Sequence, residues 1–236
     1  MATTYDNKGF TIAMGLFALL VAVYAAMQSP VFRLRSVELV GADRLMLEDV
    51  LAAGGLELGA NLFSINLREV RGALERIPLV DEVRLKRDFP ATLVVEVSER
   101  RPVAYLSASG GIWAVDVQGY VLFKADRLTM SAPVVTVSPP VEPTIGERID
   151  HPPLASALRF VAALSVKSRS NLSEVHAQET GITAYSRDRI TIALGGGGDE
   201  VEQARVLEAL LEKIDAEGLS VSRIDVSHPR APVLQR

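Results

Sequence analysis

One uninterrupted apolar segment stands near the N-terminus of the chain. Residues 9–27 hold no charged side chain, and as a helix they would measure about 28 Å, close to the ~30 Å thickness of a bilayer's hydrocarbon core. A helix of this length in a soluble protein would show a polar stripe, which this segment lacks. The pattern predicts a membrane-spanning helix over residues 9–28, preceded by a short tail over residues 1–8.

A cleaved signal peptide is the alternative interpretation of this segment. The Val23-Tyr24-Ala25 triplet would allow cleavage before Ala26. The long apolar run and the weakly basic start, with Lys8 as its only basic side chain, favour an uncleaved anchor instead. No second run approaches 18 apolar residues, so we expect everything after Pro30 to lie on one side of the membrane.

Alternating and helical patterns over residues 31–101 predict a small α+β domain. The expected order is strand, helix, helix, strand, strand, with Leu74 and Val95 in the core. The expected elements are a strand over 32–40, a helix opened by Asp43 and stopped by Gly54 and Gly55, a helix opened by Asn66 with Glu69 and stopped by Pro78, a strand with Val83 and Leu85 on its buried face, and a return strand over 92–97.

Residues 102–228 predict a second, β-rich α/β domain. The expected strands cover 112–117, 120–123, 134–137, 174–177, 182–186, 190–194 and 221–226, with helices over 152–166 and from Asp199 to Gly218. Asp116 to Gly119 forms the turn of a hairpin in this pattern. Residues 229–236 are expected to be either a frayed tail or an edge strand, since Pro229 and Pro232 each remove a hydrogen-bond donor.

Several charged and apolar clusters have plain structural interpretations. Asn61 to Phe63 is expected to tuck two apolar side chains under the helices. The charges of Glu99 to Arg101 are expected to be solvated at the domain junction, and those of Arg84, Lys86 and Arg87 to protect a strand edge against aggregation.

Composition excludes several classes of protein. The chain has 236 residues, of which 48% are hydrophobic and 23% charged, so it has the composition of a folded protein rather than a disordered one. A formal net charge of −4 gives no reason to expect nucleic acid as a partner. Because the chain has no cysteine, disulfides, a cysteine nucleophile, a thiolate zinc site and an iron–sulfur cluster are excluded.

The sequence predicts no enzyme, cofactor or metal site. His151, His176 and His228 are scattered, and neither the HExxH nor the GxSxG pattern occurs. The glycine run at 195–198 lies between a strand and a helix, where phosphate could bind, but the acidic Asp199 and Glu200 that follow favour a turn. An extracytoplasmic hydrolase with an unrecognised site stays open as an alternative.

Four segments together carry a resemblance to a known family. SVELVG at 36–41, GANLF at 59–63, PLVDEV at 78–83 and PATLVVEVSERRPVA at 90–104 resemble a POTRA domain. The ERRPVA ending, followed by WAVDVQGYVLF at 113–123, resembles the bacterial cell-division family FtsQ/DivIB. The resemblance covers roughly residues 9–228, and it implies an α+β protein made of one membrane helix, one POTRA domain and one β-rich domain.

This resemblance implies a membrane-anchored, non-enzymatic scaffold of the division machinery. The expected partners are FtsB-like (DivIC-like) and FtsL-like single-span membrane proteins and, through them, the septal peptidoglycan synthase. The implied location is the cytoplasmic membrane at the septum, with a cytoplasmic N-terminus and extracytoplasmic domains. A POTRA-bearing accessory of outer-membrane protein transport or assembly is the alternative.

The last strand is the expected partner-binding site. An edge strand leaves backbone N–H and C=O groups unpaired, and a partner strand can add to them. The resemblance implies the same, because this family captures the FtsB-like partner with its C-terminal strands; the chain lacks the arginine that members carry soon after the aspartate at position 225. The predicted contact residues are Ile224, Asp225, Val226, Ser227, His228, Arg230, Val233 and Leu234.

Overall fold

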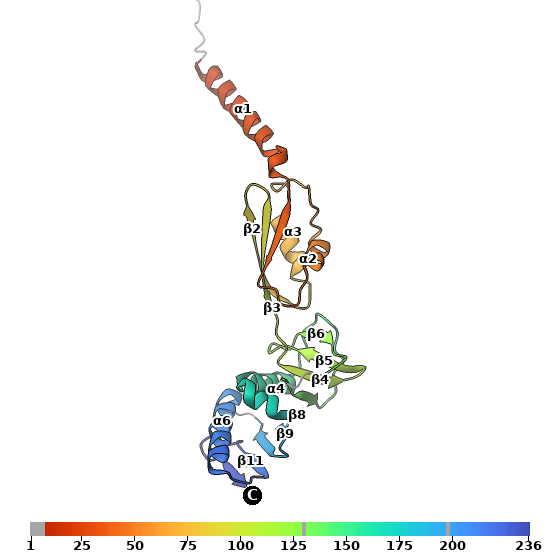
Figure 1. Ribbon diagram of the computed structural model, residues 1–236, viewed down its shortest axis with the longest axis vertical. Coiled ribbons are helices and arrows are strands. Elements are labelled where there is room, and N and C mark those ends of the chain that lie inside the picture. The colour runs from red at the N-terminus through yellow and green to blue at the C-terminus, as the bar shows by residue number, and fades with distance from the viewer. Residues whose placement is uncertain (1–7, 129–130, 197–198) are drawn as a thin grey trace, which may run out of the picture. The chain divides into compact units, whose positions relative to one another are not determined.

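The computed structural model describes residues 8–128, 131–196 and 199–236. The chain divides after Glu99 into two compact units, which we call the first unit and the second unit (Figure 1). The division falls two residues before the border expected from the sequence. Apart from Lys8, the predicted tail over 1–8 lies outside the described residues, and so does the second half of the glycine run at 195–198.

The first unit begins with an exposed apolar helix. Helix α1 (Lys8–Met27) has no buried side chain over residues 9–27 and a mean hydropathy of 2.2 there. A helix that buries none of its apolar surface in the protein is long and apolar enough to cross a membrane. The expected helix over 9–28 therefore forms with nearly the predicted bounds.

The rest of the first unit has the predicted strand–helix–helix–strand–strand order. The elements are η1 (Pro30–Phe32), β1 (Ser36–Val40), α2 (Leu47–Gly54), α3 (Leu67–Leu74), β2 (Val80–Asp88) and β3 (Thr92–Glu99). Strand β3 lies at the centre of the sheet, parallel to β1 and antiparallel to β2 (Figure 1). Leu74 and Val95 are both fully buried, which confirms their predicted place in the core.

Helix starts and strand limits differ from the sequence pattern in detail. Strand β1 begins at Ser36 rather than at residue 32, because the chain first makes the short helix η1. Helix α2 starts after Met46, whose N–H donates to the Asp49 carboxylate (3.3 Å), so the predicted cap by Asp43 is wrong. Asn66 caps α3 as predicted, by accepting from the backbone N–H of Arg68 (3.2 Å).

Strand β2 lies at an edge of this sheet, where the sequence predicted basic residues. Arg87 is not a solvated edge charge, however. Its guanidinium donates to the carbonyl oxygens of Leu62 (2.9 Å) and Ile65 (2.7 Å) and so fixes the loop before α3. Leu62 is fully buried, as the sequence suggested, while Phe63 packs on other aromatic rings instead.

The second unit is a nine-stranded mixed sheet covered by helices. Its elements are β4 (Ala104–Ala108), β5 (Gly111–Val115), β6 (Val121–Lys124), β7 (Val134–Val137), α4 (Pro152–Ala163), α5 (Val166–Asn171), β8 (Leu172–Gln178), β9 (Gly181–Ser186), β10 (Thr191–Gly195), α6 (Glu200–Glu217), β11 (Arg223–Asp225) and β12 (Val233–Gln235). The strand order is β12-β11-β10-β9-β8-β7-β4-β5-β6.

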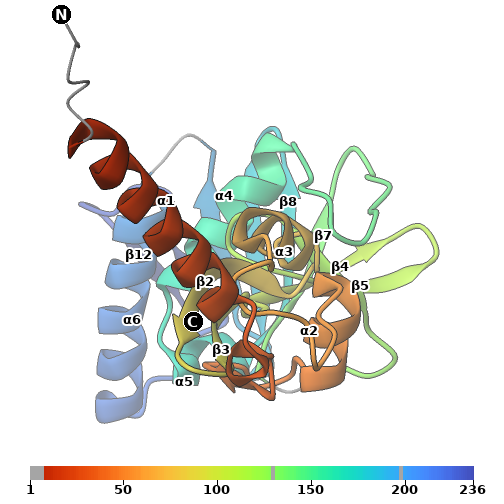
Figure 2. The same ribbon diagram turned by 90° about the horizontal axis from the view of Figure 1, so that it is seen from above.

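Helices α4 and α6 pack against each other, and α4 packs on β8 of this sheet (Figure 1). Figure 2 shows α6 along its whole length. Fully buried Phe160 of α4, Leu207 of α6 and Ile192 of β10 belong to one apolar core. The sequence pattern missed β4 and α5, and it extended α4 past Ala163, where the chain leaves the helix at Leu164.

Candidate functional site

The C-terminal hairpin forms one edge of the second unit's sheet. Strand β11 pairs with β10 in parallel and with β12 in antiparallel register, Ile224 opposite Leu234. Residues 226–232 connect the two strands through a turn in which the N–H of Ala231 donates to the carbonyl of His228 (2.9 Å). The segment predicted to be either a frayed tail or an edge strand is therefore an edge strand.

The backbone of Leu234 faces away from the sheet. Val226 of the β11 segment donates its N–H to Ala193 of β10 (2.8 Å). Successive backbone groups of a strand point to opposite sides, so Arg223 and Asp225 face β12 instead. Their partners there are Gln235 and Val233, which leaves the N–H and C=O of the intervening Leu234 directed outward.

The predicted contact residues occupy different environments. Ile224 and Val226 are fully buried in the core, so their side chains do not reach the surface. Val233 is 51% exposed, and Leu234 is half-buried against the core. His228 and Arg230 are exposed on the connecting turn. The structure thus leaves β12 and the turn as the accessible part of the predicted set.

Asp225 and Ser227 form a local polar pair beside this edge. The hydroxyl of Ser227 donates to the Asp225 carboxylate (2.6 Å), and so does its backbone N–H (3.0 Å). These two hydrogen bonds hold the pKa of Asp225 below its ordinary value. Asp225 therefore stays ionised, and it braces the start of the turn that leads to β12.

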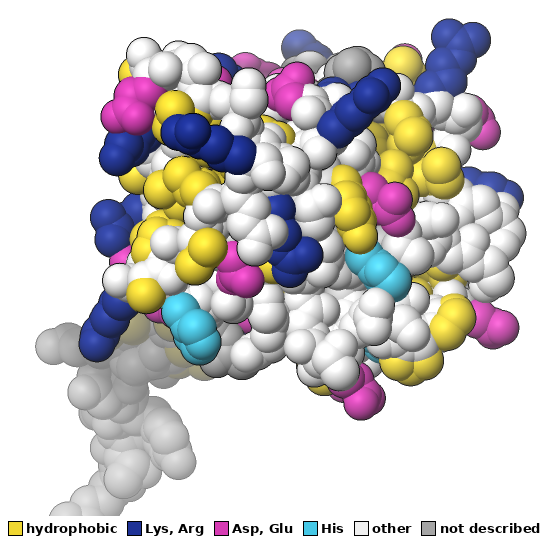
Figure 3. Space-filling model, turned by 90° about the horizontal axis from the view of Figure 1, so that it is seen from below, with side chains coloured by type: hydrophobic (Ala, Val, Ile, Leu, Met, Phe, Trp, Pro, Cys, Tyr) yellow, Lys and Arg dark blue, Asp and Glu magenta, His cyan; other side chains and the backbone are white. Residues whose placement is uncertain are grey.

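The surface around this edge carries mixed chemistry. Seen from the end of the second unit, apolar, basic, acidic and histidine side chains are interspersed (Figure 3). Such a mixture does not steer a strongly charged ligand. It also does not distinguish a protein–protein interface from the rest of a protein's surface.

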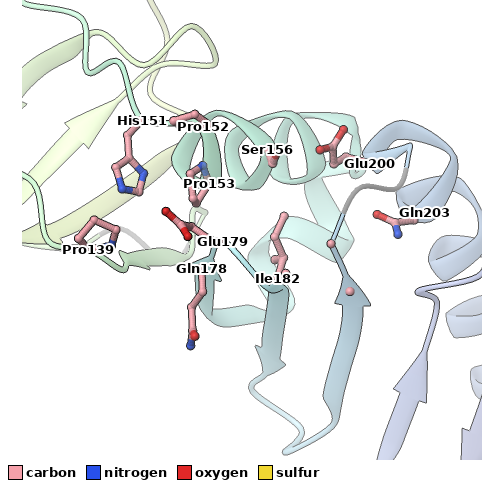
Figure 4. Close-up of a pocket in the computed structure, with 13 residues that line it drawn as sticks. Pro139, His151, Pro152, Pro153, Ser156, Gln178, Glu179, Ile182, Glu200 and Gln203 are labelled. Atoms are coloured by element: carbon pink, nitrogen blue, oxygen red, sulfur yellow. The ribbon is translucent and has the colours of Figure 1, made fainter.

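A hollow of about 420 Å³ lies between the start of α4, the β8–β9 turn and the start of α6 (Figure 4). Two of its polar side chains have partners: His151 Nδ1 accepts from the N–H of Leu154 (3.3 Å), and Gln203 donates to Leu194 O (2.7 Å). Gly195 and Gly196 of the glycine run also line it.

Of the two acidic side chains that line this hollow, Glu179 and Glu200, Glu200 is held in an ion pair. Burial would raise the pKa of Glu200, but hydrogen bonds from Arg159 and Ser156 keep it below its ordinary value. Arg159 lies 3.1 Å from the Glu200 carboxylate. Over residues 8–128, 131–196 and 199–236, no three His, Asp or Glu side chains gather as metal ligands would.

The charges of Glu99 and Arg100 are not solvated as the sequence suggested. The Glu99 carboxylate accepts from the backbone N–H groups of Asp43 (3.0 Å), Arg44 (2.9 Å) and Leu45 (2.7 Å). Arg100 donates to Asp116 at 2.8 Å, with side chains only 12% and 6% exposed. Each residue therefore fixes a loop of its own unit. For the Arg100–Asp116 pair, the position of Asp116 in a hairpin turn was the feature of the sequence that could have indicated a structural role.

Comparisons with known proteins give consistent matches. The family model described as POTRA domain, FtsQ-type, matches residues 32–100. Cell division protein FtsQ of Anaeromyxobacter sp. (strain K) is 30% identical over 212 residues, which cover 87% of this chain and 71% of that protein. Cell division protein FtsQ of Streptomyces griseus is 26% identical over 205 residues, covering 86% of this chain and 96% of the relative.

Among solved structures, the major extracytoplasmic domain of the trans isomer of the cell division protein DivIB from Geobacillus stearothermophilus is similar to part of this chain. It covers 52% of this chain and 99% of its own, at 16% identity and a TM-score of 0.34.

Proposed function

The chain belongs to the FtsQ/DivIB family of cell division proteins, and on that premise we propose that it is a membrane-anchored scaffold of the division machinery. It binds FtsB-like (DivIC-like) and FtsL-like single-span proteins and, through them, helps to recruit or regulate septal peptidoglycan synthesis. Helix α1 holds it in the cytoplasmic membrane at the septum, with a cytoplasmic N-terminus and both folded units outside the cytoplasm.

The observation that carries this proposal is the outward-facing backbone of β12. Leu234 offers one N–H and one C=O to an added strand, beside the exposed side chain of Val233. Pro232, two residues earlier, offers a carbonyl but no donor, which keeps the template short. A short template offers a partner strand few registers in which to pair. A shift of one residue between these registers would turn every partner side chain to the opposite face of the sheet.

Buried Ile224 and Val226 have an indirect part in this proposal. Their side chains anchor β11 in the core, and β11 in turn carries β12 through the pairing of Ile224 with Leu234. Val233, His228 and Arg230 remain as the side chains that meet the partner. Arg230 is placed to pair with an acidic partner residue.

A proline substitution in β12 tests the proposal. Leu234→Pro removes the outward donor and places a ring where the added strand would lie, while leaving the groups that bond β11 in place. We expect it to weaken binding of the FtsB-like protein by about tenfold or more, as measured by titrating the partner against the detergent-solubilised full chain.

Leu234→Ala is the matched control, since it removes the same half-buried side chain but keeps the N–H. We expect it to bind with nearly the affinity of the parent. Equal binding by L234P and the parent would move the interface elsewhere, and the first unit would then be the better candidate. Recovery of outer-membrane components instead of small division proteins would favour the transport alternative.

A further inference from the structure

Three phenylalanines form a cluster at one end of the first unit. The rings of Phe32, Phe63 and Phe89 pack on one another, two pairs edge-on and one tilted, with centroids 5.1 Å (32 to 63), 6.1 Å (32 to 89) and 5.1 Å (63 to 89) apart. Each comes from a different connecting segment: η1, the loop before α3, and the β2–β3 turn. Three separate loops therefore bring one aromatic ring each to the same place.

This aromatic cluster is separate from the core of the unit. Within residues 8–99, none of the three rings belongs to the apolar side chains that form or touch that core. Phe89 is 53% exposed, and neighbouring Val31 is 51% exposed. Large apolar side chains that gather outside a core and face solvent indicate a contact surface.

The cluster lies where the apolar helix ends. Only two residues separate Met27, the last residue of α1, from η1. The side chain of Asn61 donates to the carbonyl of Met27 (2.8 Å), which ties the loop before α3 to the helix end. Because Phe32 is five residues from Met27, it stays within roughly 18 Å of the helix end even if the chain between them is fully extended.

Two exposed arginines lie close to the cluster in the sequence. Arg33 and Arg35 are exposed and alternate with fully buried Leu34, so both point away from the core. Among the described residues neither has an ion-pair partner. Exposed Asp88, beside Phe89, adds an acidic side chain at this end.

We propose that the aromatic cluster seats the first unit on the outer surface of the membrane. Phe89 and Val31 enter the boundary between headgroups and acyl chains, while Arg33 and Arg35 contact lipid phosphates. Aromatic and aliphatic side chains backed by basic residues suit this boundary, which lies about 5–10 Å deep, and guanidinium groups match phosphate geometry. This proposal rests on the proposed membrane anchoring by α1.

The anchor makes a weak surface contact sufficient. Once α1 is inserted, the cluster is held beside the bilayer, so its contact is effectively intramolecular and needs little affinity of its own. The contact fixes the direction in which the first unit leaves the membrane. It also explains why aromatic rings, rather than polar side chains, occupy three loops that would otherwise face water.

Spin labels on single cysteines test this placement. The chain has no cysteine, so Phe89→Cys and Met46→Cys each give one label on the full-length protein reconstituted in phosphatidylethanolamine–phosphatidylglycerol vesicles. Met46 is the control because it is also exposed (66%) but lies at the other end of the first unit. The N–H of its neighbour Leu45 donates to Glu99, the last residue of β3, whereas Phe89 lies just before Thr92, the first residue of β3.

The measured quantity is the ratio of a label's accessibility to oxygen over its accessibility to a water-soluble nickel reagent. We expect this ratio to be several-fold higher for the label at position 89 than for the label at position 46. Replacing both Arg33 and Arg35 by glutamine should reduce that ratio. Thermal unfolding of each labelled protein, unchanged from the parent, shows that the label has not disturbed the fold.

Equal, water-like accessibility at both positions overturns the proposal, provided the protein resists alkaline extraction from the vesicles. If alkaline extraction instead releases the protein from the vesicles, α1 does not anchor it, and it is the proposed function that fails. Protection at position 89 that appears only when the FtsB-like protein is added makes the cluster a protein-docking surface and also overturns the membrane contact.

Discussion

At the scale of single residues, neighbours in sequence serve different parts of the molecule. Glu99 and Arg100 look like one charge cluster, yet Glu99 caps a loop of the first unit and Arg100 pairs with Asp116 in the second. Arg100 also lies 3.9 Å from the centre of the Tyr120 ring. Asp116 in turn accepts from the N–H groups of Gln118 (2.9 Å) and Tyr120 (2.8 Å), so this ion pair closes the β5–β6 turn.

Removal of Arg100 should destabilise the second unit. Arg100→Ala leaves the Asp116 carboxylate buried without its cation, so we expect a loss of about 3 kcal/mol in the free energy of unfolding. Urea unfolding of the detergent-solubilised chain measures it, because the single tryptophan, Trp113, lies in β5 close to this turn.

Lys167→Ala is the control for that measurement. Lys167 pairs with Asp215 at 3.2 Å, but its side chain is 85% exposed, so its loss should cost no more than about 0.5 kcal/mol. Similar losses for the two variants would contradict a structural role for the buried pair.

At the scale of elements, periodicity predicted most of the fold. Alternation of buried Leu93, Val95 and Val97 marked β3, and Asp199 and Gly218 marked the two ends of α6. Strand β4 was missed because Pro102, just before it, is a loop signal, although Tyr105 and Leu106 are both buried within it. A strand with both faces covered shows no alternation to detect.

The edge strand was predictable in place but not in detail. The sequence suggested an edge strand over Ala231 to Leu234, after Pro229, and β12 forms at Val233–Gln235, after Pro232. Which backbone groups face outward depends on the pairing of Arg223 with Gln235, a register that the sequence of one strand does not specify. Ile224 and Val226, which the sequence predicted as contact residues, are buried because they belong to the covered strand β11 and its extension.

The attachment of the β1–α2 loop to β3 should depend on pH. Burial alone would raise the pKa of Glu99, but the backbone N–H groups of Leu45, Arg44 and Asp43 outweigh it and hold the pKa below its ordinary value. A carboxylate with a lowered folded-state pKa stabilises the protein above its unfolded pKa, about 4.3, and that contribution is lost as pH falls through the folded value.

Glu99→Gln removes this titration. We expect the variant to be less stable than the parent by about 1–2 kcal/mol near neutral pH, because one amide oxygen replaces an ionised acceptor of three N–H groups. The difference in melting behaviour, followed by circular dichroism, should shrink as pH falls from about 5 to about 3. A constant difference across that range would show that Glu99 is not the group that titrates.

At the scale of the whole molecule, the apolar helix α1 opens the first of two units whose folded parts differ in construction. The first unit holds a three-stranded sheet and the second a nine-stranded one, and each has its own apolar core. Separate cores let each unit fold around its own residues, while α1 contributes nothing to either. The helix is therefore free to serve as an anchor alone.

We expect α1 to remain in the mature protein. Its apolar stretch of 19 residues exceeds the roughly 7–15 residues of a signal-peptide core, and the helix continues past the cleavage point suggested at Ala26 to Met27. Intact-mass measurement of the protein purified from membranes tests this expectation. A mass corresponding to a start at Ala26 would make the chain a secreted soluble protein.

The position of β7 has a kinetic consequence. This four-residue strand pairs in parallel with β4 on one side and with β8 on the other. The strands β4, β5 and β6, and likewise β8, β9 and β10, pair in antiparallel register with the strand that follows them in the chain. Hairpins form in about 1–10 μs, but the partners Tyr105 and Glu174 lie far from Val134 in sequence. We expect the closing of those two loops, rather than the forming of the hairpins, to limit how fast the second unit folds.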